Sequence, residues 1–298
     1  MQANRYLVWT ALLSCVLAAP ALGQEHPKET PPPDAQSTEI TQVQALLDKS
    51  FKAMAQVQDY SGVMIKRERF GDEVKTETMK FKFARPFKVY AKVIAPKEGE
   101  EAMYIKGSNH DKVRAHLGRF PDITVSLDPR GRRAMKDNRH PITSFGIEHM
   151  LEVTANNIRK AIRRHEGTFK VSDDTVLGQA AWRIDVTYPK GGRWVVAQKG
   201  ENLWDFAERV GQDMFVIMEN NKDIDSPTDI DAGQRIFVPC HYAGRGEYFI
   251  TKKTGILIKA SSWGQSGQLM ESYEYPELHL NPGLTAKDFD YHNKEYDF

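Results

Sequence analysis

Few residues of this chain are spaced in a way that would support catalysis. The 298 residues contain no Gly-x-Ser-x-Gly nucleophile elbow, phosphate-binding loop, dinucleotide-binding glycine fingerprint or His-Glu-x-x-His metal helix. Glu68, Glu100 and Glu101 also lack a spacing that would indicate the carboxylate pair of a glycosidase. We therefore expect no catalytic residues and no cofactor, and the residues favour a binding protein.

Two groups of side chains resemble partial metal sites. His149 and Glu152 share one face of an expected helix, but no third ligand accompanies them, so a solvated polar face is favoured. Near the C-terminus a calcium loop would lack its central glycine; its ligands would be Asp288, Asp290, Asn293, Glu295 and Asp297. The aromatic residues among them indicate a tail docked by packing, and they are Phe289, Tyr291, Tyr296 and Phe298.

Charge is balanced overall but not locally. The chain has 41 basic and 40 acidic residues, a net charge of +1 that argues against a general nucleic-acid binder. Residues 130–165 hold nine Lys or Arg and three Asp or Glu, whereas residues 193–240 hold five and nine. If the basic residues cluster, they would attract lipid phosphates, an anionic wall polymer or an acidic partner; the alternative is a solvated surface.

The first 23 residues have the pattern of a secretory signal peptide. Arg5 is followed by an apolar run from Tyr6 to Ala19, and small residues at 21 and 23 suit a signal peptidase. This run is shorter than the roughly 20 apolar residues of a membrane span. We therefore expect the mature chain to be secreted. Cys240 is then the single cysteine of the mature chain, which excludes an internal disulfide and favours a small buried residue.

Hydrophobic periodicity predicts an α+β fold. After a disordered leader at residues 24–38, apolar residues recur at helical spacing over 40–57 and again over 145–164, where Thr143 or Ser144 would cap the helix. Alternating apolar and polar residues predict strands of a curved antiparallel sheet. These are 63–69, 79–83, 89–93, 102–106, 112–117, 123–127, 181–188, 248–252, 256–261 and 269–280.

One segment, residues 193–240, interrupts this sheet. Its pattern is strand, helix, helix, strand, and it separates two strands, 181–188 and 248–252, that should pair with each other. An insertion of this kind requires that its own ends lie close together, as they do when its first and last strands pair. The larger domain would then comprise residues 39–192 plus 241–298.

Two motifs give this insert a family resemblance. Residues 195–204, Val-Val-Ala-Gln-Lys-Gly-Glu-Asn-Leu-Trp, match the opening strand and Gly-Asp-Thr-Leu-Trp turn of the LysM family. Residues 230–239, Ile-Asp-Ala-Gly-Gln-Arg-Ile-Phe-Val-Pro, match its Ile-x-x-Gly-Gln-x-Leu-x-Ile-Pro ending. The segment resembles a complete LysM domain, a small βααβ module. The resemblance implies binding to glycans that contain N-acetylglucosamine, such as peptidoglycan.

In the LysM family the glycan lies in a shallow groove between two loops, held largely by backbone amides and carbonyls. Carried over, the glycan-binding residues are Gly200, Glu201, Asn202 and Leu203 in one loop and Asp223, Ile224, Asp225 and Ser226 in the other. This sequence departs from the family at the opening tyrosine, which falls at Val195 or, with an extra residue, at Trp194, and at Asp-Thr, replaced by Glu201-Asn202. A LysM shell kept as a spacer is the alternative to sugar binding.

The flanking segments carry a second resemblance. Its motifs are Asp59-Tyr60-Ser61-Gly62, Arg67-Glu68-Arg69, Arg85-Pro86-Phe87-Lys88-Val89-Tyr90, Arg139-His140-Pro141-Ile142-Thr143, Leu280-Asn281-Pro282-Gly283-Leu284-Thr285 and Asp288-Phe289-Asp290. They resemble the bacterial family of unknown function DUF1571 over nearly all of residues 55–298 outside the insert. More loosely, the order of elements is similar to LolA-like periplasmic lipoprotein carriers and RseB-like sensors. Those folds leave an apolar concavity for acyl chains, which Met79, Phe81 and Phe83 would line unless they form plain core.

The leading hypothesis is a non-catalytic periplasmic protein. Its insert would bind peptidoglycan, and its larger domain would bind a lipid, a lipoprotein or another envelope protein. This predicts an apolar cavity without converging carboxylates. One alternative, a cell-wall-remodelling enzyme targeted by LysM, requires a cleft with titratable groups at reacting distance. The other, a structural or signalling module, predicts a large exposed apolar patch without a deep cavity.

Overall fold

The computed structural model describes residues 33–298, so the expected signal peptide and most of the expected leader lie outside the described residues. The first helix, α1, spans Pro33–Ala55. The expectation that the leader continues to residue 38 is therefore wrong for residues 33–38. Pro33 is suited to a first helical position because the N–H that it lacks would have no partner there. Thr41 adds a bond from its Oγ1 to the carbonyl oxygen of Ser37.

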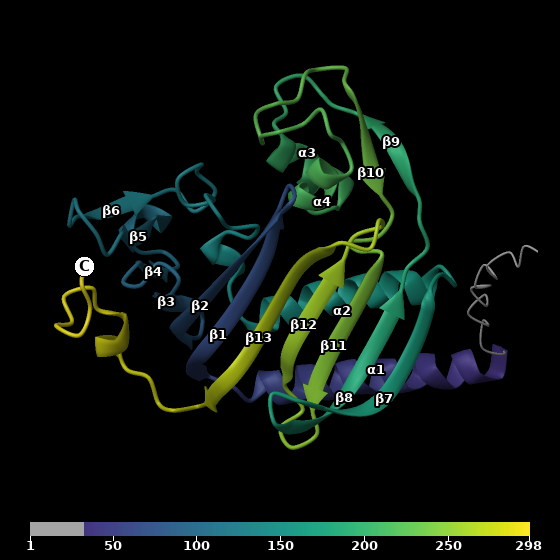
Figure 1. Ribbon diagram of the computed structural model, residues 1–298, viewed down its shortest axis with the longest axis horizontal. Helices are drawn as coiled ribbons and strands as arrows, with labels where there is room; N and C mark the ends of the chain where they lie inside the picture. Colours follow the sequence, from purple (N-terminus) through teal and green to yellow (C-terminus); the bar gives the residue numbers. More distant parts are fainter. Residues whose placement is uncertain (1–32) are drawn as a thin grey trace, which may run out of the picture. The chain divides into compact units, whose positions relative to one another are not determined.

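Within the described chain, eleven strands form one antiparallel sheet in the order β6-β5-β4-β3-β2-β1-β13-β12-β11-β8-β7 (Figure 1). Their bounds are β1 (Asp59–Phe70), β2 (Glu73–Ala84), β3 (Lys88–Ala95), β4 (Glu101–Ile105), β5 (Val113–His116), β6 (Thr124–Leu127), β7 (Thr168–Val176), β8 (Gln179–Thr187), β11 (Arg245–Thr251), β12 (Leu257–Trp263) and β13 (Leu269–Leu280). The α+β class and the antiparallel sheet are as predicted. Strand β7 was missed because Asp173 and Asp174 interrupt its apolar alternation.

Helices α1 and α2 (Ile147–Arg163) cover the same face of the sheet (Figure 1). Leu151 and Ile158 of α2 are fully buried in one core with residues of both helices and of the strands. The expected cap of α2 is wrong. Ile142–Ser144 forms a short 3-10 turn instead, and Gly146 precedes the helix with a positive φ of 116°.

The insert has the predicted order of elements: β9 (Gly192–Val196), α3 (Leu203–Val210), α4 (Met214–Glu219) and β10 (Arg235–Pro239). Its two strands pair antiparallel, and the flanking strands β8 and β11 pair with each other as predicted. Asn202 caps α3 by accepting bonds from the amides of Trp204 and Asp205. Cys240, whose amide donates to Gly191 O at 2.9 Å, is half-buried rather than buried.

The C-terminal residues form the predicted docked tail. Phe289 and Tyr296 pack with Tyr90 and Met103 in a small separate core. Two of the acidic residues that could have suggested a calcium loop are engaged by lysines: Asp288 lies 2.8 Å from Lys82, and Asp297 lies 2.8 Å from Lys92.

The side-chain amide of Asn221 stabilises the insert through three hydrogen bonds. This buried side chain donates to Ile217 O (2.7 Å) and Phe237 O (2.8 Å) and accepts from Phe237 N (2.8 Å). Asn221→Ala leaves buried backbone groups without partners, so we expect it to destabilise the insert by on the order of 2–4 kcal/mol. Limited proteolysis should then cut within residues 193–240 first. Asn220→Ala is the matched control, because this exposed side chain makes one bond, to Val216 O; equal sensitivity of the two variants would contradict the prediction.

Candidate functional site

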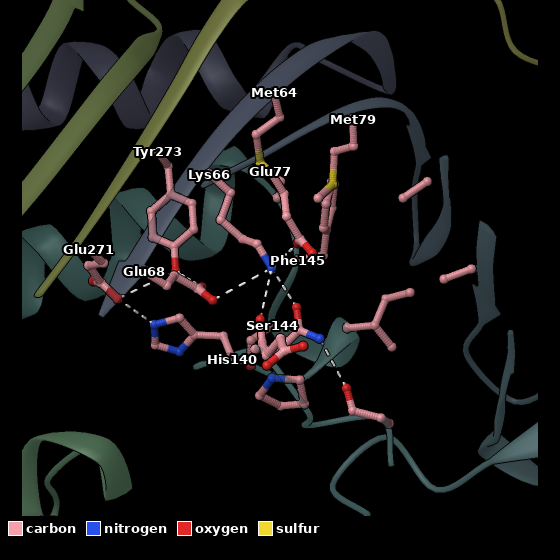
Figure 2. Close-up of a pocket in the computed structure, with 18 of the residues that line it drawn as sticks. Met64, Lys66, Glu68, Glu77, Met79, His140, Ser144, Phe145, Glu271 and Tyr273 are labelled. Carbon is pink, nitrogen blue, oxygen red and sulfur yellow. Dashed lines mark hydrogen bonds and ion pairs between the residues drawn. The ribbon is translucent and has the colours of Figure 1, made fainter. Parts of the chain in front are cut away.

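A cavity of about 300 Å³ lies on the helix-covered face of the sheet. Strands β1 to β6 and β11 to β13 supply one wall, and the segment from Arg133 to Asn157, which includes much of α2, supplies the opposite wall. Much of the lining is apolar: Met64, Met79, Ala91, Val93, Ala102, Val113, Ala115, Leu127, Ile142, Phe145, Met150 and Val153. Figure 2 shows the part where this apolar lining meets a group of charged side chains.

Small side chains on neighbouring strands account for the hollow. Ala91, Ala102 and Ala115 are successive cross-strand partners on β3, β4 and β5, and all three line the cavity. Phe81 on β2 pairs with Ala91 and is buried in the main core, as is Phe83. Met79 therefore lines the cavity, as the resemblance implied. Phe81 and Phe83 do not line it and belong to the core, which was the alternative.

A row of polar residues crosses the same face. Lys66 on β1 is the cross-strand partner of Glu77 on β2 and of Tyr273 on β13. The ammonium group of Lys66 lies 2.8 Å from Glu77, 3.5 Å from Glu68 and 2.6 Å from the side-chain oxygen of Asn138. Burial lowers the pKa of Lys66, but Glu68 and Glu77 raise it by more, so it remains charged. Figure 2 shows these side chains converging below Met64 and Met79.

Two residues further along β1, Glu68 is the cross-strand partner of Glu271 on β13. Two carboxylates therefore lie on adjacent strands. Glu68 accepts bonds from the Tyr273 hydroxyl (2.5 Å) and from the amide of Arg139 (3.1 Å). Glu271 accepts a bond from the Tyr242 hydroxyl at 2.7 Å, and its other oxygen lies 2.9 Å from His140 Nε2. Each buried carboxylate therefore has several partners.

The pair of His140 and Glu271 is held in its ionised form. Burial alone would lower the pKa of His140, but the adjacent Glu271 outweighs it and raises the pKa to about 9. Burial would raise the pKa of Glu271, but His140 and Arg139 lower it to about 2. Burial and the positive charge of His140 lower the pKa of the nearby His149. At neutral pH His140 is thus charged, whereas His149 is neutral.

The same cluster joins the cavity to the insert. Arg139, 1% exposed, forms an ion pair with Glu219 at the end of α4, and its guanidinium lies 5.3 Å from the ring of Phe215. His140 Nδ1 lies 4.0 Å from the carboxylate of Asp213, the residue that caps α4. The polar wall of the cavity is therefore also the contact surface of the insert.

The structure brings the two predicted glycan loops together, because Leu203 N donates to Pro227 O at 2.8 Å. The side chains named for the site have mostly structural contacts. Leu203 and Ile224 are buried in the insert core, Asn202 caps α3, and Glu201 pairs with Arg209. Gly200, Asp223 and Asp225 are exposed, Ser226 is half-buried, and Asp223 accepts a bond from Gln234. Recognition there would rest on backbone groups.

Several sequence interpretations need correction at the cavity. The expected solvated face of His149 and Glu152 is wrong for His149, which lines the cavity. Glu68, set aside because it lacked a paired spacing, meets a carboxylate about 200 residues further along the chain. The basic residues of the stretch 130–165 do not form one patch. Arg139 is buried, and Arg133 and Lys136 line the cavity. Lys160 and Arg164 line a separate small hollow beside the insert. The hint available in the sequence was that Glu68, Arg139 and His140 all lie in the quoted family motifs.

Two further findings concern residues 33–298 alone. None of their helices is long and apolar enough to cross a membrane. No three of their His, Cys, Asp or Glu side chains are grouped as a metal ion would require.

The fold and the site define an α+β protein with a partly apolar cavity bordered by a buried ion cluster. The family described as "Protein of unknown function (DUF1571)" matches residues 57–219 and 238–298. The chain belongs to this family, as the motifs predicted. Among curated proteins, none shows significant sequence similarity to the chain.

Several solved structures are similar to this chain. The complex of Pseudomonas aeruginosa MucA and MucB matches with 11% identity and a TM-score of 0.40, covering 84% of this chain and 60% of the other. The Mycobacterium tuberculosis lipoprotein LppX matches with 11% identity and a TM-score of 0.39, covering 84% and 98%. A LolA superfamily protein from Nitrosomonas europaea matches with 10% identity and a TM-score of 0.29, covering 83% and 96%.

The ion pair at the cavity makes stability depend on pH. The pKa of His140 is about 9 in the folded chain against an ordinary 6.5, so its contribution is complete below pH 6.5 and is lost as pH rises through 9. The pKa of Glu271 is about 2 against an ordinary 4.5, so its contribution is complete above pH 4.5 and is lost as pH falls through 2. We expect the pair to add on the order of 2 kcal/mol to the free energy of unfolding between these limits.

Urea unfolding at pH 6 and at pH 9 checks this expectation. His140→Gln should abolish most of the loss of stability between the two pH values. His279→Gln is the matched control, since this histidine lies on the surface beside Glu277 and should leave the loss unchanged. A His140→Gln variant with the same pH dependence as the parent protein would show that the pair does not set it.

Proposed function

We propose that the cavity binds the acyl chain of a lipid or of a lipidated protein, in the bacterial periplasm. The observation that supports this most directly is the apolar lining around Ala91, Ala102 and Ala115, which leaves space where a closed core would be filled. Apolar side chains on both walls would surround a hydrocarbon chain. The charged cluster at one side would lie beside a polar head group.

The converging carboxylates were expected only of an enzyme, so they bear on the alternative. A general base needs a free lone pair near neutral pH; the protonated His140 has none, whereas the neutral His149 keeps one. Lys66 remains an ammonium ion among acceptors, and Glu68 and Glu271 are both engaged by donors. Apart from His149, the titratable groups of this cluster neutralise one another, which favours binding without a covalent step.

Filling the cavity should abolish binding of a lipid probe. In Ala102→Trp the indole would occupy the space beside Ala91 and Ala115, so we expect the affinity for cis-parinaric acid to fall at least about tenfold. Fluorescence titration of purified residues 24–298 measures this, because the probe brightens when it leaves water. This protein includes the whole compact unit from residue 32 onward.

Ala180→Trp is the matched control, since Ala180 lies on a strand of the same sheet but is exposed and outside the cavity. It should bind the probe as the parent protein does. Circular dichroism and thermal melting establish that both variants are folded. No saturable binding by the parent protein would refute the proposal, as would unchanged binding by a folded Ala102→Trp variant.

We also propose that residues 193–240 are a LysM module that binds peptidoglycan. The βααβ order and the bond from Leu203 of the first predicted loop to Pro227, the residue that follows the second, support this second function. The proposal makes residues 39–192 plus 241–298 the discontinuous larger domain. The insert would hold the protein at the cell wall while the larger domain binds its lipid.

Sedimentation with insoluble peptidoglycan tests the second function. The parent protein should sediment, and Asp225→Trp should reduce the bound fraction at least about threefold, because an indole at this exposed loop position would obstruct the groove. Asp231→Trp, exposed in the insert but outside the two loops, is the control. Soluble muropeptides released in the same tube would instead favour a cell-wall enzyme. Absence of binding by the parent protein would leave the insert as a spacer.

A further inference from the structure

The connection between β5 and β6 exposes apolar side chains to solvent. Phe120 is 95% exposed, Ile123 is 49% exposed and Leu117 is 37% exposed. These are three of the most exposed large apolar residues among the described part of the chain, and they lie within seven consecutive positions. Scattered apolar residues on a surface are ordinary, but a group of them in one short loop marks an interaction site.

Contacts within the protein hold this loop in place. Gly118 packs against the backbone of Gly99, where a Cβ atom would collide. His116 Nε2 lies 2.6 Å from Asp122 Oδ1, and Ile123 N donates to Pro121 O at 3.0 Å. The loop is therefore fixed at both ends, while Phe120 at its centre makes little contact with the rest of the protein.

The loop lies at the opening of the cavity. Of the lining residues that the structure describes, those that are exposed are Leu117, Lys97, Arg133 and Lys136. Leu117 thus belongs both to the loop and to the opening, and the other three are cations. An entrance with one apolar and three basic side chains suits a ligand that has a hydrocarbon part and a negative charge.

The surrounding stretch is strongly basic. Residues 112–136 hold seven Lys or Arg and two Asp, a net charge of +5. Arg119, Arg132, Arg133 and Lys136 form no ion pair with any residue between 33 and 298. Cations that lack an internal partner remain available to an external anion, and each strengthens binding to an anionic lipid surface about fivefold.

We propose that this face docks on an anionic lipid membrane. Phe120 and Ile123 enter the interface between head groups and acyl chains, the unpaired cations contact lipid phosphates, and the cavity opens toward the bilayer. An aromatic side chain beside basic residues is the combination that binds peripheral proteins to such an interface. The inference builds on the proposed acyl-chain site, since docking would bring the cavity to its source of lipid.

Vesicle sedimentation separates the charge and apolar contributions. Residues 24–298 should bind vesicles of phosphatidylcholine with phosphatidylglycerol, bind pure phosphatidylcholine at least about tenfold more weakly, and dissociate as salt is raised. Phe120→Ser with Ile123→Ser should lower the partition coefficient about tenfold or more. Arg133→Gln with Lys136→Gln should lower it by about the same factor. Val74→Ser is the control, because Val74 is 37% exposed but lies on β2 outside this face.

Equal binding to both vesicle types would overturn the inference, as would unchanged binding by the serine double variant. Binding of cis-parinaric acid in solution distinguishes this failure from that of the proposed function. If the parent protein binds the probe but does not bind vesicles, the proposed docking surface is wrong and the proposed acyl-chain site is supported. If it binds anionic vesicles through Phe120 but takes up no probe, the docking surface stands and the acyl-chain site is wrong.

Discussion

The carboxylate of Glu271 joins three parts of the chain, and the candidate site depends on it. Glu271 belongs to β13, its partners His140 and Arg139 precede α2, and its partner Tyr242 follows the insert. An unpaired charge buried at this depth would destabilise the fold by several kcal/mol. The sheet, the wall opposite the sheet and the end of the insert must therefore assemble together. Such coupling explains why polar residues occur on a sheet face that is otherwise core.

The cavity and the core come from the same strand faces and differ in side-chain size. Phe81 on β2 fills its position and joins the main core, whereas its neighbours across β3 to β5 are alanines. Backbone pairing fixes the distance between strands, so replacing large by small residues along one row leaves a hollow that the sheet cannot close. Helix α2 covers part of this face, and the hollow remains between its first turns and the alanine row.

Local patterns predicted the elements well and the site poorly. Period-two alternation placed nearly every strand, and the insert was recognised because β8 and β11 needed each other as partners. Helical spacing grouped His149 with Glu152 on one face, but His149 lines the cavity whereas Glu152 is exposed, because spacing along a helix does not reveal what each side chain faces. The meeting of Glu68 with Glu271 depends on the register between β1 and β13, two strands separated by most of the chain. Such a register follows from the whole sheet and is not encoded in local spacing.

The uneven charge of the sequence has two separate physical roles. Part of the basic stretch is neutralised by the acidic insert, since Arg139 pairs with Glu219 and His140 faces Asp213. These contacts hold the insert against the larger domain and are unavailable to a ligand. Arg133 and Lys136, a few residues away, have no such acidic partner in the described chain and stand at the opening of the cavity. A net charge counted along the sequence cannot separate the two roles. The exposure of each side chain separates them, because only exposed cations that lack an acidic partner can attract a charged surface.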